Sequence, residues 1–373
     1  MRRRLNGCLS AAVLLVISFG AYGQQPEFLG LGFTRAYGIS GDGTTVVGQN
    51  GSLAVRWRVG TGIEDLGNLG GSLNKAKGVS RNGSVITGYS RLGGSEYHAF
   101  RWTEALGMTD LDDLPGGEHS SRGMSGVSDD GSVIIGSGTS TSGTEAFRWT
   151  SSEGITGLED LAGGKFYSSA RNCSPDGSIV VGVSISGSYG GGYDTYEPFL
   201  WTAAEGMVGL GQLVGGRPGG SAYDVSADGS IVVGAGAPLS GNEEAFVWTP
   251  QTGAMVGLGD FEGGGMYSRA FAITPDGSTI VGRGSSYIGE EAFIYDTEHG
   301  MRKFRDVLTS EYGLDLNGWI LRDASGISDD GTVLVGYGLN PAGDTEAWMA
   351  VIPEPATLSL LGVGALAMLR RRK

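Results

Sequence analysis

Seven copies of one sequence unit run through most of this chain, and they constrain its fold more than any other feature. Each copy opens with Ala-x-Gly-Ile/Val-Ser-x-Asp/Asn-Gly-Ser/Thr, continues with three mostly β-branched or apolar residues and a glycine, and later carries Ala-Phe-x-Trp-Thr, Gly-Met and Leu-x-x-Leu-x-Gly-Gly. Successive copies are 40 to 54 residues apart. Their Asp/Asn-Gly pairs are Asp42-Gly43, Asn82-Gly83, Asp130-Gly131, Asp176-Gly177, Asp228-Gly229, Asp276-Gly277 and Asp330-Gly331. A repeat of this length predicts an array of small units that bury their apolar faces against one another.

Each Asp/Asn-Gly pair lies between two short β-branched runs, which predicts a β-hairpin. We expect both turn residues to have positive φ. In the fifth copy, for example, residues 222–226 turn at Asp228-Gly229 into residues 231–233.

A third strand carries two large side chains, two residues apart and therefore on one face. The pairs are Phe100 and Trp102, Phe147 and Trp149, Phe199 and Trp201, Phe246 and Trp248, and Phe293 and Tyr295, with Val55 and Trp57 in the first copy and Trp348 and Ala350 in the last. We expect them to fill the space between stacked sheets. Fourth strands are expected at residues 65–69, 110–114, 159–161, 208–213 and 256–261.

Four short strands in each unit of this length are typical of a β-propeller blade, whereas a β-solenoid, the alternative, usually has shorter coils. Residues 28–32 match the fourth strand, and the last copy stops after its third strand at residues 347–351. The N-terminal strand can therefore complete the last blade and leave no free sheet edge. The sequence predicts an all-β, seven-bladed β-propeller of four-stranded blades.

The N-terminus is typical of a signal peptide. Basic residues 2–4 precede an apolar run at residues 9–20, and a small-x-small cleavage site ends at Gly23, before Gln24. We therefore expect residues 1–23 to be removed during export. Cys8 leaves with them, so Cys173 has no intrachain partner for a disulfide and is interpreted as a small buried hydrophobe.

At the C-terminus, Pro353-Glu354-Pro355 precedes an apolar run at residues 356–369, and Arg370, Arg371, Arg372 and Lys373 end the chain. This order resembles the PEP-CTERM sorting signal of Gram-negative bacteria that secrete exopolysaccharide. The resemblance implies that the tail holds the exported protein in the inner membrane until an exosortase processes it, and that the product reaches the cell surface or extracellular matrix. An ordinary membrane anchor and a helix docked on the domain are the alternatives.

The apolar run is short for a membrane span. Fourteen residues rise about 21 Å as a helix, against a hydrocarbon core of roughly 30 Å. The flanking arginines would have to reach the interface to cover the difference.

The repeats also resemble the HAF-type extracellular repeat, which is named for His-Ala-Phe and occurs literally at His98-Ala99-Phe100. The resemblance covers residues 28–351, and it implies an extracellular location but no defined chemistry. The chain thus divides into the signal peptide (1–23), the propeller (24–352) and the sorting signal (353–373).

Charge excludes some partners. Without the three arginines of the leader and the four basic residues of the tail, 19 basic residues face 39 acidic ones in residues 24–352, a net charge of about −20. Such a surface repels nucleic acid and anionic phospholipid.

The position of the family's histidine holds one imidazole and five carboxylates in a ring, with a leucine in the first copy, and the residues are Leu53, His98, Glu145, Glu197, Glu244, Glu291 and Glu346. A metal site is one interpretation. Third strands lie away from the axis, however, so successive blades separate these groups by more than about 10 Å, whereas calcium requires ligands at roughly 2.3 to 2.6 Å. We expect strand-end hydrogen bonds to a neighbouring loop, or simple exposure, and we predict no metal, cofactor or catalytic residue.

Two long insertions mark a candidate ligand face opposite the Asp-Gly turns. Residues 183–197 carry Tyr189, Tyr193, Asp194 and Tyr196, and residues 308–323 carry Tyr312 and Trp319. Aromatic rings beside carboxylates suit sugars, although they equally suit loop packing. The expected function is a binding or structural protein of the surface or exopolysaccharide, and the alternative is a propeller lyase or hydrolase acting on polysaccharide.

Overall fold

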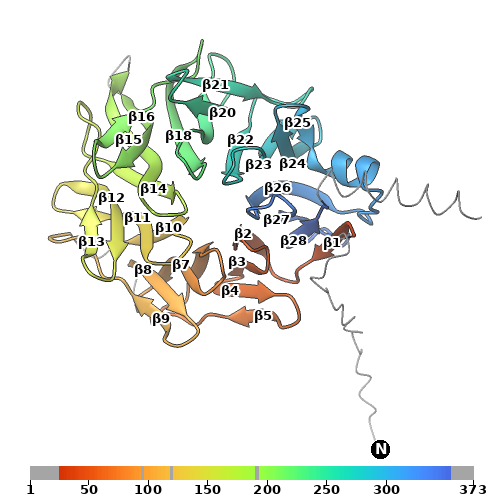
Figure 1. Ribbon diagram of the computed structural model, residues 1–373, viewed down its shortest axis with the longest axis horizontal. Coiled ribbons are helices and arrows are strands. Elements are labelled where there is room, and N and C mark those ends of the chain that lie inside the picture. Colours follow the sequence, from red (N-terminus) through yellow and green to blue (C-terminus); the bar gives the residue numbers. More distant parts are fainter. Residues whose placement is uncertain (1–24, 94–95, 118–120, 190–192, 354–373) are drawn as a thin grey trace, which may run out of the picture.

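Seven four-stranded antiparallel sheets surround a central axis in the computed structural model (Figure 1). The structure describes residues 25–353 except 94–95, 118–120 and 190–192. Helix is limited there to one turn, α1 (Phe304–Asp306), which continues into a short π-helix, η1 (Val307–Glu311). The predicted all-β, seven-bladed propeller is confirmed.

In each blade the four strands run outward from the axis in chain order. The first strands line the centre of the ring (Figure 1) and are β2 (Arg35–Ile39), β6 (Asn74–Val79), β10 (Arg122–Val127), β14 (Ser168–Cys173), β18 (Arg217–Val225), β22 (Arg269–Ile273) and β26 (Ile320–Ile327). The second strands are β3 (Thr45–Asn50), β7 (Val85–Arg91), β11 (Val133–Ser140), β15 (Ile179–Tyr189), β19 (Val232–Ala237), β23 (Ile280–Ser286) and β27 (Val333–Leu339). The third strands are β4 (Leu53–Arg58), β8 (Tyr97–Thr103), β12 (Gly143–Thr150), β16 (Tyr193–Thr202), β20 (Glu244–Thr249), β24 (Gly289–Asp296) and β28 (Thr345–Val351). The outermost strands are β5 (Gly62–Asp65), β9 (Gly107–Asp110), β13 (Gly154–Gly157), β17 (Gly206–Gly209), β21 (Ala254–Gly259), β25 (Gly300–Lys303) and, in the seventh blade, β1 (Glu27–Gly30).

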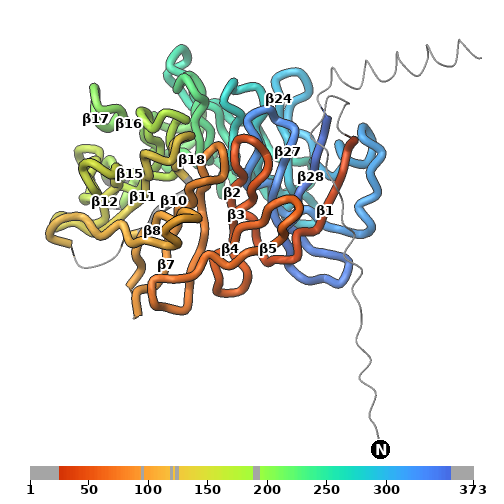
Figure 2. The backbone as a smooth tube through the Cα atoms, turned by 60° about the horizontal axis from the view of Figure 1, so that its bottom comes forward, coloured from red at the N-terminus to blue at the C-terminus, as the bar shows by residue number. Residues whose placement is uncertain are grey.

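The N-terminal strand closes the ring, as the sequence predicts. Strand β1 pairs antiparallel with β28, and Glu27 lies opposite Val351 (Figure 2). Two further backbone bonds extend the pairing, from Leu31 N to Ala347 O at 2.9 Å and from Ala347 N to Phe33 O at 2.7 Å. The seventh sheet therefore combines both ends of the propeller.

The Asp-Gly hairpins form as predicted, but their turn geometry differs from the expected one. Only the glycine has positive φ, for example 71° at Gly229. The turn is longer than two residues, because Ser226 N donates to Ile231 O at 2.9 Å and Gly229 N donates to Ser226 O at 3.0 Å. Side chains hold it: Asp228 Oδ1 accepts from Ser226 Oγ at 2.8 Å and from Ser230 N at 2.9 Å. The aspartate thus remains right-handed, and its carboxylate supports the loop.

The fourth strands begin earlier than the sequence analysis placed them. In the third blade, β13 starts at Gly154, whose φ is 70°, and ends before Leu158. The leucines of Leu-x-x-Leu lie beyond the strands and are buried, as Leu66, Leu111, Leu158 and Leu210 show. Their apolar spacing reflects insertion of the connecting segment into the space between blades rather than a strand.

The aromatic pairs fill the space between blades only in part as expected. Phe100, Phe147, Phe199, Phe246 and Phe293 are completely buried. The aromatic side chains two residues later are mostly half-buried, and Trp102 alone among them is buried. The glycine that ends each β-branched run makes room for the rings, since a Cβ on Gly182 would lie 2.8 Å from the Phe199 ring and 2.2 Å from Ser169 O.

Candidate functional site

The predicted ligand residues of the fourth blade lie at one hairpin. Tyr189 and Tyr193 are register partners at the end of the β15–β16 ladder. Asp194 forms an ion pair with Lys165 at 3.1 Å, and the Tyr196 ring packs edge-on against Tyr167 with centroids 5.6 Å apart.

The second predicted set belongs to the packing of the seventh blade. Trp319 contacts Phe28 edge-on at 5.4 Å, and the Tyr312 hydroxyl donates to Pro353 O at 3.3 Å. The β15–β16 hairpin and the connection between β25 and β26 lie on opposite sides of the ring (Figure 1). The structure therefore does not gather the two sets into one site.

The third-strand glutamates form the expected strand-end hydrogen bonds. Four of them accept a backbone N–H from a residue at the end of the neighbouring outermost strand or two residues beyond it. The bonds join Glu159 N to Glu145 at 3.1 Å, Gly211 N to Glu197 at 3.0 Å, Gly259 N to Glu244 at 3.1 Å and Gly32 N to Glu346 at 2.9 Å. These carboxylates act as structural acceptors within their own blades.

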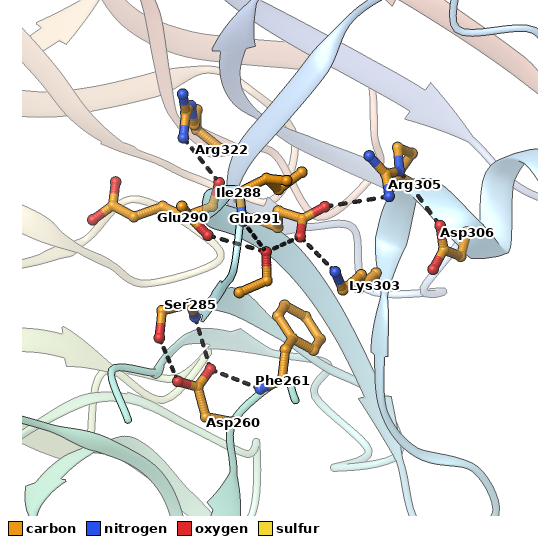
Figure 3. A network of polar contacts seen from close by, with 12 residues as sticks. Asp260, Phe261, Ser285, Ile288, Glu290, Glu291, Lys303, Arg305, Asp306 and Arg322 are labelled. Carbon is orange, nitrogen blue, oxygen red and sulfur yellow. Dashed lines mark hydrogen bonds and ion pairs between the residues drawn. The ribbon is translucent and has the colours of Figure 1, made fainter. Parts of the chain in front are cut away.

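In two blades a contact between side chains replaces this bond. Glu291 is buried and lies 2.6 Å from Lys303 Nζ and 3.6 Å from Arg305, as Figure 3 shows. Burial opposes ionisation of Glu291, but the bonds from Lys303 and Ser286 hold its pKa below the ordinary value. His98 Nδ1 lies 2.9 Å from Asp110 Oδ2. Among the described residues, no cluster of three or more His, Cys, Asp or Glu side chains could hold a metal ion.

A cavity lies at the centre of the ring. It has a volume of about 370 Å³, and all seven inner strands contribute to its wall. Its lining extends along the axis from the level of Lys77 to that of Arg81, four residues later, or roughly 13 Å along an extended strand. This volume suits a small ligand.

The sequence analysis did not identify this cavity. Part of its lining comes from the residue that follows the alanine at the start of the repeat, which is Tyr37, Lys77, Arg171, Tyr223, Phe271 or Ser325. The sequence does contain a signal for this cavity, because the residue after the repeat's alanine changes between aromatic, basic and small side chains.

Lys77 lies in the channel wall against an aromatic ring. Its Nζ lies 3.6 Å from the centroid of the Tyr37 ring. Removal from water is the main cause that lowers the pKa of Lys77 to about 7, and repulsion from Lys75 and Arg171 acts in the same direction. Burial in the channel wall therefore disfavours the charged form of Lys77, and a bound anion would favour it.

Four aspartates line the same cavity, and burial raises the pKa of two of them, Asp224 and Asp323, to about 7. Asp224 joins three blades, because it accepts from Asn172 Nδ2 at 2.6 Å, from Val225 N at 2.8 Å and from Ile273 N at 2.8 Å. Asp323 accepts only a long bond, from Tyr337 N at 3.4 Å. Asp224 is thus a structural link, whereas Asp323 has more capacity for other partners.

The Asp-Gly end of the cavity carries a charged rim. Arg81 lies 3.4 Å from Asp129 and 3.1 Å from Asp329, and it therefore links three inner strands. Backbone bonds join neighbouring turns at this end, including Asp129 N to Pro175 O at 2.7 Å and Asp329 N to Gly41 O at 3.0 Å. The rim is consequently a rigid part of the ring.

Cys173 also borders the cavity, but it is buried in the core between blades. Burial raises the pKa of its thiol to about 12. The thiolate needed for nucleophilic chemistry is therefore negligible at neutral pH.

Comparison with known proteins identifies the tail. The PEP-CTERM protein-sorting motif matches residues 351–373. The expected cleavage site at Gly23 and Gln24, and the tail from Glu354 to Lys373, lie outside the described residues. Within the described part of the chain, no helix has the length and hydropathy to cross a membrane. No curated protein matches the sequence.

Solved structures share the fold. Oligogalacturonate lyase from Vibrio parahaemolyticus superimposes with a TM-score of 0.59 and 12% identity, over 90% of this chain and 99% of that one. The β-propeller domain of the Trilobed protease from Pyrococcus furiosus gives 0.54 and 11%, over 88% and 94%. TolB from Acinetobacter baumannii gives 0.48 and 14%, over 74% of this chain and 63% of that one. At these identities the likeness concerns the fold alone.

Proposed function

We propose that this exported, exosortase-sorted protein is a binding and structural component of the cell surface or exopolysaccharide. The sorting motif at residues 351–373 is the observation that carries the location. The net charge of the propeller and the resemblance of its repeats to HAF-type extracellular repeats support the same compartment. In this proposal the inner membrane is a transient site, held through the apolar run before processing.

We infer further that the ligand occupies the central channel. The cavity brings together aromatic and cationic side chains from several blades, whereas the two long-loop sets are separated and largely engaged in packing. A closed ring of seven sheets also holds those side chains rigidly, which reduces the ordering cost of binding.

The location is tested by changing the motif without changing the apolar run. Glu354→Ala should accumulate as an unprocessed membrane species in a host with an exosortase, while the unaltered protein loses its tail and appears at the surface or in the matrix. The control is Glu27→Ala, which makes the same chemical change outside the motif. Equal amounts of full-length, membrane-bound protein in both cases would show a plain anchor.

The binding role is tested with the exopolysaccharide of the producing cells. The processed protein should co-sediment with that polysaccharide, and a glycan array should give binding to a restricted set of structures. Absence of binding to any polysaccharide, together with unprocessed tails, would refute the proposed function.

A polysaccharide-active enzyme is the second candidate. The observation in its favour is that Lys77 and Asp323 line one cavity with pKa values near 7, where groups can exchange protons under physiological conditions. The shared fold with an oligogalacturonate lyase is compatible with a lyase. Depolymerisation of polyuronide that disappears in Lys77→Gln would establish this alternative.

A further inference from the structure

The channel contains cations without carboxylate partners. No ion pair joins Lys77 or Arg171 to any carboxylate among residues 25–353 that the structure describes, and the buried Nε of Arg171 has no hydrogen-bond acceptor there. Arg35 and Lys75 lie on β2 and β6, two residues before Tyr37 and Lys77, and contact aromatic rings instead. Arg35 lies 4.2 Å from the centroid of the Tyr337 ring. The channel therefore holds two cations, Lys77 and Arg171, that form no ion pair with a described residue, although Asp224 and Asp323 also line its wall.

The lack of partners is informative because carboxylates outnumber cations about twofold in residues 24–352. Outside the channel, cations of the described propeller commonly pair with them: Arg56 with Glu64, Arg302 with Glu311 and Lys303 with Glu291. A buried cation without a counter-charge is costly. An external anion would remove that cost.

The surrounding rings restrict the kind of anion. Tyr37 lies under Lys77, and its hydroxyl donates to Gln49 at 2.9 Å, which fixes the ring. Across the channel, Tyr223 packs edge-on against Phe271 with centroids 5.7 Å apart. Rigid aromatic faces beside cations suit a molecule with an apolar ring face as well as a charge. A bare inorganic ion would use only the cations.

We propose that the central channel binds a carboxylate-bearing sugar, either a free uronate or the uronate end of a polysaccharide. Lys77 and Arg171 contact the carboxylate, and the rings of Tyr37, Tyr223 and Phe271 contact the sugar. The volume of about 370 Å³ accommodates a small sugar unit rather than a long chain. This inference rests on the proposed function for the presence of an extracellular polysaccharide.

The test measures binding to the purified full chain in mild detergent by isothermal titration calorimetry. The probes are galacturonate, galactose and trigalacturonate at equal ionic strength. We expect galacturonate to bind at least about tenfold more tightly than galactose, which lacks the carboxylate. If galacturonate and trigalacturonate bind equally, a single sugar occupies the channel; if the trimer binds more tightly, the occupant is a chain end.

Variants assign the residues. Lys77→Gln and, separately, Arg171→Gln should each weaken galacturonate binding at least about tenfold while changing galactose binding little. Lys165→Gln is the matched control, since it removes the same charge from an exposed site on the outside of the ring. Circular dichroism and thermal unfolding verify the fold, and the two variants lie on different blades, so one can be tested if the other does not fold.

Equal binding of galactose and galacturonate would overturn the proposal, as would unchanged binding in both folded channel variants. Its failure can be separated from that of the proposed function. If the protein co-sediments with the native exopolysaccharide and Lys77→Gln does not affect this, the ligand is different but the binding role stands.

Discussion

A methyl group on Gly157 would lie 2.0 Å from Glu145 Oε1, so the glycine of the outermost strand provides the space for the carboxylate of its neighbour. The same relationship joins Gly209 to Glu197 and Gly257 to Glu244, with distances of 2.2 and 2.1 Å. In two blades the outermost strand has a charged residue at this place and the third strand has a partner for it, Lys303 with Glu291 and Asp110 with His98. In the first blade Asp65 lies at this place, and the third strand has Leu53 instead. The polar ring is thus explained by contacts within each blade.

This pairing predicts that Gly157→Ala destabilises the propeller by about 1–3 kcal/mol, because the new methyl group must displace the Glu145 carboxylate. The double variant Glu145→Ala/Gly157→Ala should recover part of that loss. Gly187→Ala is the control, since a Cβ there meets no atom within 4 Å and Gly187 does not have positive φ. Denaturant unfolding measures all three. Equal effects at Gly157 and Gly187 would contradict the assignment.

Ring closure makes the N-terminal strand essential for stability. Deleting residues 24–33 removes the pairing of β1 with β28 and the buried side chains of Leu31 and Phe33. We expect a loss of several kcal/mol and a lower melting temperature. Removing only residues 24–26, which precede the strand, should have little effect. An unchanged melting temperature after the longer deletion would contradict closure by β1.

The aromatic pairs predict unequal costs for their two members. Phe147 is completely buried, whereas Trp149 is half-buried at the edge of the same cluster. Phe147→Ala should therefore cost about 3–5 kcal/mol, and Trp149→Ala should cost less. Chemical unfolding of both variants measures the difference, and the reverse order would place the tryptophan in the core instead.

Much of this fold follows from the constant residues of the repeat. Asp-Gly pairs locate the hairpins, the Phe-x-Trp pairs locate the third strands, and the phase of residues 28–32 gives the closure. The exact turn depends on side-chain bonds such as Ser226 to Asp228, which a two-residue turn rule does not include. The predicted fourth strands lie too late in the chain, because buried leucines such as Leu158 resemble part of a strand although they come after the strand has ended.

The channel is harder to predict for a physical reason. Six inner strands contribute this variable residue, and only closure brings Lys77 near Arg171, which is 94 residues later in the chain. A consensus emphasises what the repeats share, whereas this cavity is built from what differs among them. The long insertions suggest a ligand face from the sequence, but Trp319 packs against Phe28.

The stability of the propeller at acid pH tests the role of the turn aspartates. Hydrogen bonds from serine or threonine side chains and backbone amides hold the pKa of the turn residues Asp130, Asp176 and Asp276 below the ordinary value. Their contribution is present above the unfolded pKa of about 4 and is lost as the pH falls through the lower folded values. We expect unfolding free energy to decrease below about pH 4, and Asp276→Asn to reduce that slope. Identical acid profiles for the variant and the unaltered protein would contradict this role.

Asp323 predicts the opposite slope at higher pH. Burial raises its pKa to about 7, against the effects of Arg283, of the Tyr337 backbone amide and of Arg35, while Glu290 adds to the rise. Between about pH 4 and 7 the folded protein therefore holds a proton that the unfolded chain has released, so the contribution of Asp323 to stability falls as the pH rises.

Asp323→Asn removes this titration while retaining an oxygen that can accept from Tyr337 N, at 3.4 Å in the unaltered protein. The variant should gain stability relative to the unaltered protein from pH 4 to 7, and the difference should become constant above that range. Urea unfolding at pH 4, 5.5, 7 and 8 measures the difference, with Asp315→Asn, an exposed aspartate outside the channel, as the control. A constant difference across all four pH values would mean that Asp323 is ionised throughout, and its charge would then offset part of the positive charge of Lys77, Arg81 and Arg171, the three cations of the channel lining.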